Sequence, residues 1–339
     1  MATLPDTLSY AHDDEPGITR KKIGRAWGYF DAAGKRVTDR DEIDRLNKIG
    51  MPPAYRDCWF CADPRGHIQG IGYDEKGRKQ YRYHVDFRAA AEAEKYERCA
   101  DFGRALPKLR AKVDADLGRR TLNRETVIAA IVRLLDLGRV RIGNDAYAKA
   151  NKSFGATTLR QKHAKASGSR VRLEYLGKSG KQQSITVTDR RLATIVKRLQ
   201  DLPGQRLFQY VDNNGERHAI GSHDVNDYIK QATGRDFTAK TFRTWGASVL
   251  AYQHLIESAE RGCTLKTMLA PVAAALGNTP AISRKSYVHP ALIALARSGG
   301  LKQGCPIRLP RAKRYLQPAE RGLIAFLDTL GEEKLKEAA

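Results

Sequence analysis

The sequence predicts an α+β protein with a small antiparallel β-rich N-terminal domain and a larger, mainly α-helical domain that contains a short β-sheet with a hairpin. Three observations carry this prediction. From Thr19 to Phe87, short alternating segments are separated by turn residues, as in antiparallel strands. After Phe87 the apolar residues recur with a helical period over about two hundred residues. Within those helices, residues 156–188 return to strand-like alternation around a glycine-containing hairpin.

The chain of 339 residues is long enough for two hydrophobic cores, and we expect four segments. Residues 1–18 carry few apolar positions and are expected to be loosely ordered. Residues 19–90 form the β-rich domain, and residues 91–300 form the mainly helical domain. The C-terminal extension, 301–339, should hold one amphipathic helix, whose apolar positions are Leu323, Ile324, Phe326, Leu327 and Leu330.

Net charge narrows the class of partner. The 60 lysines and arginines against 38 aspartates and glutamates leave a net charge of +22. That excess indicates a polyanionic partner, most commonly nucleic acid, although an ordinary basic surface is the plain alternative. The basic residues are spread along the chain, which favours a folded surface around the ligand over a detachable tail. The sequence has no long apolar run and begins with an acidic, polar stretch, so we expect a cytoplasmic protein without membrane contact.

The five cysteines are an odd number, which fits a reducing compartment. Cys58 and Cys61 form half of a zinc-binding pattern, and His67 follows them. The surrounding residues alternate as in a strand, however, which puts the two thiols on opposite faces. We therefore interpret both cysteines as structural and expect no metal site.

The stretch over residues 74–88 has the pattern of a DNA-facing strand. A turn leads into alternation, with Gln80, Arg82 and His84 on one face and Tyr81 and Tyr83 on the other. Amide and guanidinium groups can hydrogen-bond to base edges, and Arg78 and Lys79 flank them. The alternative makes the tyrosines core residues and the charged groups a solvated rim. The pattern alone does not separate the two.

Three cations in the helical domain follow recognisable breaks in the chain. A helix capped by Asn123 ends at Gly138, and Arg141 follows this end. The guanidinium group of an arginine at such a position can reach an anion. Lys178 lies at the tip of the hairpin over residues 177–180, a position where lysines are usually just solvated. Arg243 lies one turn beyond Lys240 on a helix that Thr238 should cap. That pair indicates either a basic helix edge or an anion held between two repelling cations.

The stretch Leu276–Pro290 interrupts two helices around a tyrosine. One helix should end at Gly277, and another should begin at Thr279-Pro280. Tyr287 then follows the basic pair Arg284 and Lys285, so a phenol lies among cations. The alternative is a tyrosine that merely packs.

No phosphate-binding loop, dinucleotide fingerprint or ligand set for magnesium or zinc occurs in the sequence. An enzyme that acts on DNA without such cofactors must stabilise charge with side chains, and arginines are the obvious supply. We therefore expect no cofactor.

In their order and local sequence, five blocks resemble type IB DNA topoisomerases of the small poxvirus-like kind that also occurs in bacteria. The resemblance covers roughly residues 20–295. The blocks are GRKQYRYH at 77–84, VRIGNDAY at 140–147, LGK at 176–178, KTFRTWG at 240–246 and GNTPAISRKSY at 277–287.

The resemblance implies a role for each matching residue. Tyr287 would be the nucleophile that forms a 3′-phosphotyrosyl link, and Lys178 would protonate the leaving 5′-oxygen. Arg141 and Arg243 would bind the non-bridging phosphoryl oxygens. Many relatives have histidine where this chain has Asn278, whose amide can donate a hydrogen bond but cannot transfer a proton. The resemblance also implies DNA contacts at Gln80, Tyr81, Tyr83, Tyr147 and Lys240, next to the flanking Arg78 and Lys79.

The implied function is that of a type IB topoisomerase with the fold shared by these enzymes and the tyrosine recombinases. It would nick one strand of duplex DNA, let the duplex swivel to relax positive and negative supercoils, and reseal the strand without ATP or metal. The two domains would act as a clamp around double-stranded DNA, with a monomer associated with the nucleoid.

Two alternatives remain at this point. A tyrosine recombinase or integrase uses the same cleavage chemistry, but those enzymes usually carry HxxR where this chain has Lys240-Thr-Phe-Arg243, and their first domain is helical. An architectural DNA-binding protein would have the clamp without the chemistry.

Overall fold

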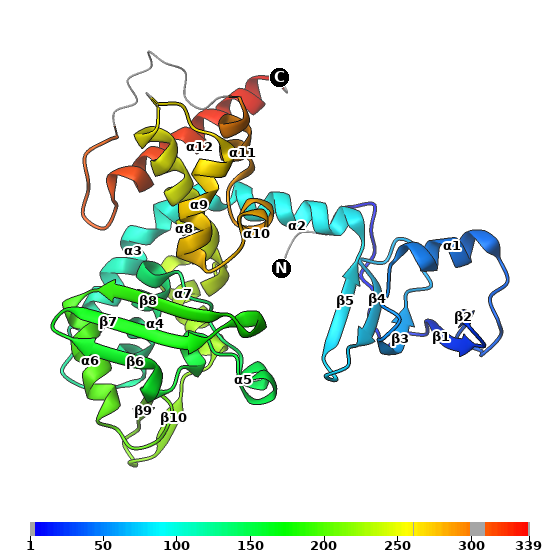
Figure 1. The fold of residues 1–339 in the computed structure, drawn as a ribbon, viewed down its shortest axis with the longest axis horizontal. Coiled ribbons are helices and arrows are strands. Elements are labelled where there is room, and N and C mark those ends of the chain that lie inside the picture. The colour runs from blue at the N-terminus through cyan, green and yellow to red at the C-terminus, as the bar shows by residue number, and fades with distance from the viewer. Residues whose placement is uncertain (1–3, 260, 299–308, 338–339) are drawn as a thin grey trace. The chain divides into compact units, whose positions relative to one another are not determined.

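A computed structural model describes residues 4–259, 261–298 and 309–337 of the chain, which divides into two compact units, 1–97 and 98–339 (Figure 1). The boundary expected at residues 90 and 91 falls inside the last helix of the first unit, α2 (Val85–Glu97). Part of the expected C-terminal extension, residues 301–308 with Cys305, lies outside the described residues.

The first unit is built on a five-stranded antiparallel sheet in the order β2-β1-β3-β4-β5. Its strands are β1 (Ile18–Ile23), β2 (Ala26–Phe30), β3 (Arg56–Phe60), β4 (Ile68–Tyr73) and β5 (Lys79–Tyr83). Helix α1 (Arg40–Lys48) begins where the Asp39 carboxylate accepts from the backbone N–H of Asp41 and Glu42, as an N-cap requires. A small core lies between helix and sheet, formed by Ile18, Tyr29, Leu46, Met51, Cys58 and Phe60.

Residues 4–18 are held against this unit, in contrast to the loose order expected for residues 1–18. Leu8 and Ala11 are buried although the sequence around them is short and mostly polar. Ser9 pairs with Gly66, and the Ala11 N–H donates to Nδ1 of His67 at 3.0 Å.

Cys58 and Cys61 are free, buried thiols. Among the described residues they do not belong with His67 to any group of three metal-binding side chains. The one such group found there is Asp212, Glu216 and His218 in the second unit. Its Asp212 carboxylate already accepts from two backbone N–H groups and contacts His218, so it closes a hairpin turn.

The second unit is mainly helical and carries the antiparallel sheet β6-β7-β8 and the hairpin β9-β10. Helices α4 and α6 pack against the three-stranded sheet (Figure 1). The strands are β6 (Ala164–Ser167), β7 (Arg170–Leu176), β8 (Gln182–Thr188), β9 (Gln209–Val211) and β10 (Arg217–Ala219). The helices are α3 (Cys99–Leu117), α4 (Arg124–Gly138), α5 (Asp145–Asn151), α6 (Arg190–Gln200), α7 (Ser222–Thr233), α8 (Ala239–Glu257), α9 (Leu265–Leu276), α10 (Pro280–Ser286), α11 (Pro290–Arg297) and α12 (Pro318–Glu337). The predicted α+β class is confirmed.

Helix α4 is the centre of this unit, because residues on nearly all of its faces are buried, from Thr126 to Leu135. Helices α3, α7 and α8 surround it together with β8. Its predicted cap is confirmed, since the Asn123 side chain accepts from the Thr126 N–H at 3.0 Å. Such a helix can hold the groups at its end rigidly. None of the described helices combines the length and the apolar composition that a membrane span needs.

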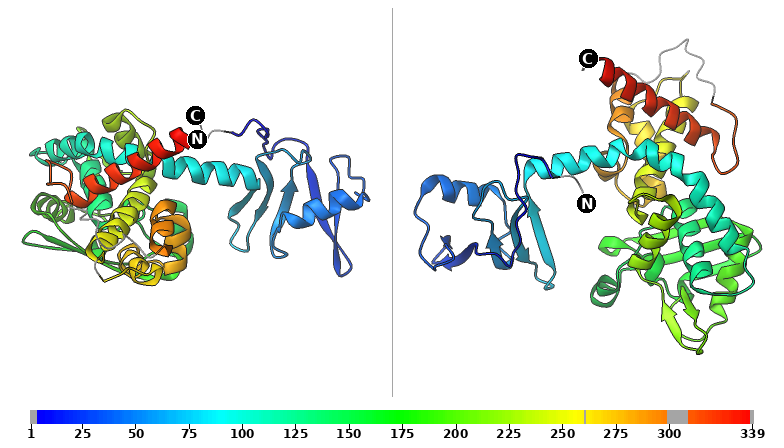
Figure 2. Two further views of the ribbon diagram at one scale, coloured as in Figure 1. Left: turned by 90° about the horizontal axis from the view of Figure 1, so that it is seen from above. Right: turned by 180° about the vertical axis from the view of Figure 1, so that it is seen from behind.

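The C-terminal helix α12 lies along α3 and α8 (Figure 2). A buried ion cluster fixes it there. The Arg110 guanidinium donates to the Asp136 carboxylate of α4 at 2.8 Å and to the Glu320 carboxylate of α12 at 2.7 Å. Glu320 also accepts from Nε1 of Trp245 on α8 at 3.2 Å. Burial raises the pKa of Glu320, but the hydrogen bonds and charge of Arg110 outweigh it, so the pKa lies below its ordinary value.

We expect Glu320→Ala to lower the free energy of unfolding by about 3 to 5 kcal/mol, because the largely buried Arg110 then keeps only one of its two carboxylate partners. Denaturant titration measures this. Since the Glu320 pKa is lowered by folding, its contribution is present above the unfolded pKa and lost as pH falls through the folded one, so the loss should shrink in acid. The matched control is Glu174→Ala in the exposed pair with Arg172, which should cost less than about 1 kcal/mol. Equal losses for both variants would contradict the argument.

Candidate active site

The end of α4 places Arg141. The helix stops at Gly138, and Arg139 takes a left-handed conformation with φ of 51°, while its N–H closes the helix onto the Leu135 carbonyl. This turn sends Val140 back into the core, and Arg141 emerges half-buried. A non-glycine residue in this conformation is strained, so the surrounding packing must stabilise it.

Arg243 comes from the first turns of α8 and is only 4% exposed. Its guanidinium donates from Nη1 to the Arg139 carbonyl and from Nη2 to the Leu276 carbonyl at 3.0 Å. These carbonyls belong to the C-terminal ends of α4 and α9, where helices leave acceptors unpaired and their dipoles favour a positive charge. Two helix ends thus share one buried arginine.

Arg243 differs in its partners from Arg110, a largely buried arginine of the same unit. Arg110 is neutralised by two carboxylates. In the described part of the chain, by contrast, neither Arg243 nor Arg141 forms an ion pair with a carboxylate. The Nε of Arg243 is also buried without a hydrogen-bond partner. A buried positive charge without a counter-charge is costly, so this arrangement is suited to an anion from outside.

The turn between α9 and α10 brings Asn278 to Arg141. Helix α9 ends at Gly277 with φ of 61°, and α10 begins at Thr279-Pro280, as the sequence predicts. The Asn278 Oδ1 accepts from Nη2 of Arg141 at 2.7 Å. The Nδ2 of Asn278 is buried without a partner in the described residues, so an amide donor is left over beside the two arginines.

Tyr287 caps the C-terminus of α10 and is partly buried. The Arg243 guanidinium carbon lies 5.0 Å from the centre of its ring. Burial alone would raise the pKa of Tyr287, but the charge and hydrogen bonding of Arg243, together with the charge of Arg141, outweigh it and set the pKa below its ordinary value. Arg284 and Lys285 are exposed and only add local charge.

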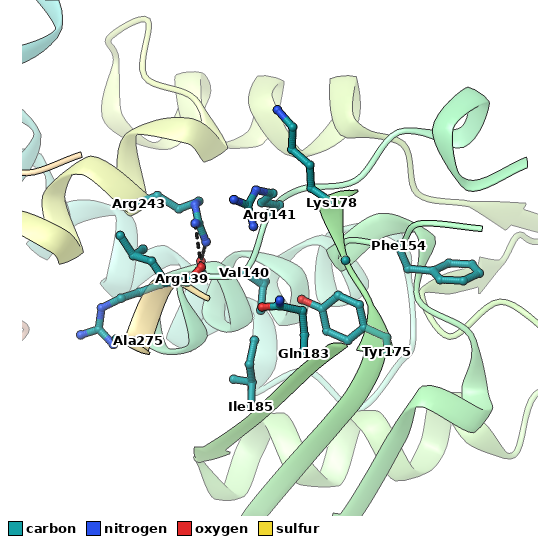
Figure 3. Close-up of a pocket in the computed structure, with 12 residues that line it drawn as sticks. Arg139, Val140, Arg141, Phe154, Tyr175, Lys178, Gln183, Ile185, Arg243 and Ala275 are labelled. Carbon is teal, nitrogen blue, oxygen red and sulfur yellow. Dashed lines mark hydrogen bonds between the residues drawn. The ribbon is translucent and has the colours of Figure 1, made fainter. Parts of the chain in front are cut away.

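Lys178 lies at the tip of the β7–β8 hairpin, in a short turn over Lys178–Gly180, and is exposed as expected. It lines a small cavity with Arg141 and Arg243 (Figure 3). In this view its side chain extends away from the two guanidinium groups. The structure thus brings all five expected catalytic residues to one region: Arg141, Lys178, Arg243, Asn278 and Tyr287.

Helix α8 differs from the expectation in two details. Thr238 occupies the N-cap position, but its side chain makes no capping hydrogen bond; instead its N–H donates to Oγ1 of Thr241. Lys240 is exposed while Arg243 is buried, so the two cations do not share one environment that could hold an anion between them. Lys240 is left free to contact a ligand at the surface.

The expected DNA-facing strand is β5. Its Tyr81 and Tyr83 are 43% and 41% exposed and stack with ring centres 5.9 Å apart, so the alternative in which they are core residues is wrong. Lys79 is paired with Asp13, and Asp74 holds both Arg78 and Gln80. In the second unit, Tyr147 on α5 is 44% exposed.

Three polar residues of the cavity were not identified as site residues from the sequence. They are Arg139, whose carbonyl holds Arg243, and Tyr175 and Gln183 from the strands of the hairpin (Figure 3). A Cβ at Gly277 would lie 2.3 Å from Gln183, so this glutamine packs directly against the turn that carries Asn278. The available signal was strand alternation, which points Tyr175 inward two residues before Gly177.

A tyrosine beside arginines that lack carboxylate partners is the arrangement expected of an enzyme that breaks and rejoins a phosphodiester. A family model for the catalytic core of eukaryotic DNA topoisomerase I matches residues 84–293 of the chain. A second model, for the N-terminal domain of bacterial DNA topoisomerase IB, matches residues 26–74. The chain therefore belongs to the type IB DNA topoisomerases.

Individual relatives agree with this assignment. The chain is 35% identical over 285 residues to the DNA topoisomerase 1B of Acanthamoeba polyphaga mimivirus, which covers 80% of this chain and 85% of the viral protein. It is 22% identical over 238 residues to the DNA topoisomerase 1B of vaccinia virus (strain Copenhagen), covering 67% and 72%. It is also 24% identical over 234 residues to DNA topoisomerase 1 of Mycosarcoma maydis, covering 62% and 23%. The predicted topoisomerase function is confirmed, and the recombinase alternative is not favoured.

The cause assigned to the lowered pKa of Tyr287 can be tested by varying pH. If Arg243 lowers this pKa, then Arg243→Gln should raise the pKa of Tyr287. The pH at which the DNA cleavage rate rises should then be higher by about 1 to 3 units. Single-turnover formation of the covalent complex across a pH series measures this shift. The matched control is Arg284→Gln, an exposed cation near Tyr287 whose field is screened by solvent. The same shift in both variants, or none in Arg243→Gln, would contradict the assigned cause.

Proposed function

We propose that Tyr287 is the nucleophile of this topoisomerase and that the cluster around it is the phosphate-binding site. The observation that supports this most directly is the buried Arg243, whose partners among the described residues are two helix ends and a phenol but no carboxylate. A scissile phosphate would supply the missing negative charge.

The reaction follows from these groups. The Tyr287 oxygen attacks phosphorus and forms a phosphotyrosyl bond to the 3′ side of the break, while the bond to the 5′-oxygen breaks. The proton lost by the phenol leaves to solvent, and Lys178 gives a proton to the departing 5′-oxygen. For Lys178 to do so, its side chain must turn toward the phosphate, which an exposed hairpin tip permits.

Three donors stabilise the charge that develops on phosphorus in this proposal. Arg141 and Arg243 bind the non-bridging oxygens through their guanidinium groups. The unpartnered Nδ2 of Asn278 donates a third hydrogen bond, while its Oδ1 keeps the Arg141 fork in place. Asn278 cannot exchange a proton, so its contribution is by hydrogen bonding alone.

The energy of the broken bond is kept in the phosphotyrosyl diester, so resealing needs no ATP. While the nick is open, torsional strain turns the duplex and supercoils of either sign relax. The first unit contributes DNA contacts from the exposed strand β5 through Gln80, Tyr81 and Tyr83, and the second through Tyr147 and Lys240. That the protein acts as a monomeric clamp around double-stranded DNA, and does so at the nucleoid, stays a prediction.

Tyr287→Phe should bind DNA with the same Kd as the wild type but form no covalent, SDS-resistant complex, because only the attacking oxygen is removed. Relaxation of supercoiled plasmid in EDTA and without ATP should be lost in parallel. Peptide mapping of the wild-type adduct checks the assignment. A covalent adduct that persists in Tyr287→Phe would overturn it, and strand exchange between paired sites would favour a recombinase.

Lys178→Ala should slow cleavage by about 10²- to 10⁴-fold, the usual contribution of a positioned general acid. A substrate with a 5′-thiolate leaving group needs no proton, so the variant should cleave it at nearly the wild-type rate. Lys181→Ala, three residues on in the same hairpin, is the matched control and should cleave both substrates normally. Equal slowing of Lys178→Ala on both substrates would exclude the acid role.

A further inference from the structure

A second tyrosine, Tyr175, lines the cavity between the catalytic cations. It is the last inward-facing residue of β7 before Gly177 and Lys178, and it is only 5% exposed. Its ring lines the same cavity as Arg141, Lys178 and Arg243 (Figure 3). The charges of Arg141 and Arg243 therefore act on the pKa values of two phenols, Tyr175 and Tyr287.

The Tyr175 hydroxyl forms no hydrogen bond with another described residue, and it is not among their fully enclosed polar atoms without a partner, so it is accessible from the cavity. Two other buried tyrosines have such a partner: Tyr228 donates to Asp116 at 2.7 Å, and Tyr29 donates to Asn47 at 2.9 Å. The O–H donor of Tyr175 is therefore available to solvent or to a ligand at the cavity. A ligand oxygen in the cavity would satisfy it.

Tyr252 lacks a partner in the same way but has different surroundings. Its ring lies against Phe326 with centres 5.8 Å apart, and burial alone raises its pKa. The Tyr252 side chain is not among those that line the cavity with Arg141 and Arg243. It is thus an apolar contact residue, in contrast to Tyr175.

The two phenols of the site are shifted in opposite directions. Burial raises the pKa of Tyr175 to about 12 although Arg243 and Arg141 oppose it, whereas the pKa of Tyr287 is lowered. At neutral pH Tyr175 therefore keeps its proton and can donate it in a hydrogen bond. Paired groups whose environments separate their pKa values in this way commonly have different roles in one reaction.

We propose that Tyr175 is a further catalytic residue, whose hydroxyl donates a hydrogen bond to a non-bridging oxygen of the phosphoryl group held by Arg141 and Arg243. The proposal rests on the function proposed for Tyr287. Tyr175 would add a neutral donor from β7 to the charged donors from α8 and the end of α4. It would join the Lys178 hairpin to the phosphate, because Tyr175 and Lys178 are three residues apart on that hairpin.

The test is Tyr175→Phe, which removes one oxygen and leaves the ring. Single-turnover formation of the covalent complex on a duplex with one cleavage site should slow by about 10- to 100-fold, as expected for loss of a donor to a charged group. The Kd for DNA and the Tm should not change. Tyr252→Phe, the matched control, should cleave at the wild-type rate. Equal rates for Tyr175→Phe and the wild type would overturn the proposal.

A second measurement separates hydrogen bonding from a change of packing. Methylphosphonate substrates replace one non-bridging oxygen with methyl, and the two diastereomers differ in which oxygen is lost. Tyr175→Phe should slow cleavage of one diastereomer and leave the rate on the other unchanged, because the accepting oxygen is then missing already. Equal slowing on both diastereomers would assign the effect to packing and overturn the proposal. If the wild type itself forms no adduct through Tyr287, the proposed function fails instead.

Discussion

The burial of Arg243 between two helix ends is the constraint on which the rest of this active site depends. A guanidinium that is 4% exposed needs acceptors, and the carbonyls of Arg139 and Leu276 supply them from the C-terminal ends of α4 and α9. Both helices must therefore stop at this place. Each does so through a left-handed residue, Arg139 in one case and Gly277 in the other. The strain at Arg139 is stabilised by the core that surrounds α4.

The same two helix ends carry the other polar groups. Arg141 follows the end of α4 and Asn278 follows the end of α9, so their hydrogen bond joins the two turns. Tyr287 lies one short helix further on, against Arg243. The contrast with Arg110, whose charge two carboxylates satisfy, separates a structural arginine from one that is available to a phosphate. Through Glu320 and Trp245, the structural cluster also fixes α12 to the helix that bears Arg243.

Local rules predicted the elements that depend on local interactions. Asn123 before α4, Gly277 after α9 and Thr279-Pro280 before α10 satisfy backbone groups within a few residues, and the structure has each helix end there. What local rules missed or left open depends on distant contacts. Leu8 and Ala11 are buried in the first unit, and Tyr81 on β5 is exposed. Neither follows from the residues beside them.

The sequence by itself determined the α+β class, the order of the catalytic blocks and the residue types that the chemistry needs. It determined these because hydrophobic period, turn residues and short motifs are local properties of a chain. Tertiary packing sets which arginines lack a carboxylate partner among the described residues, which buried amide is left without an acceptor, and which phenol is shifted toward ionisation. Tyr175 and Tyr287 are chemically identical in the sequence. Their difference arises because packing sets how much burial and how much positive charge each phenol experiences.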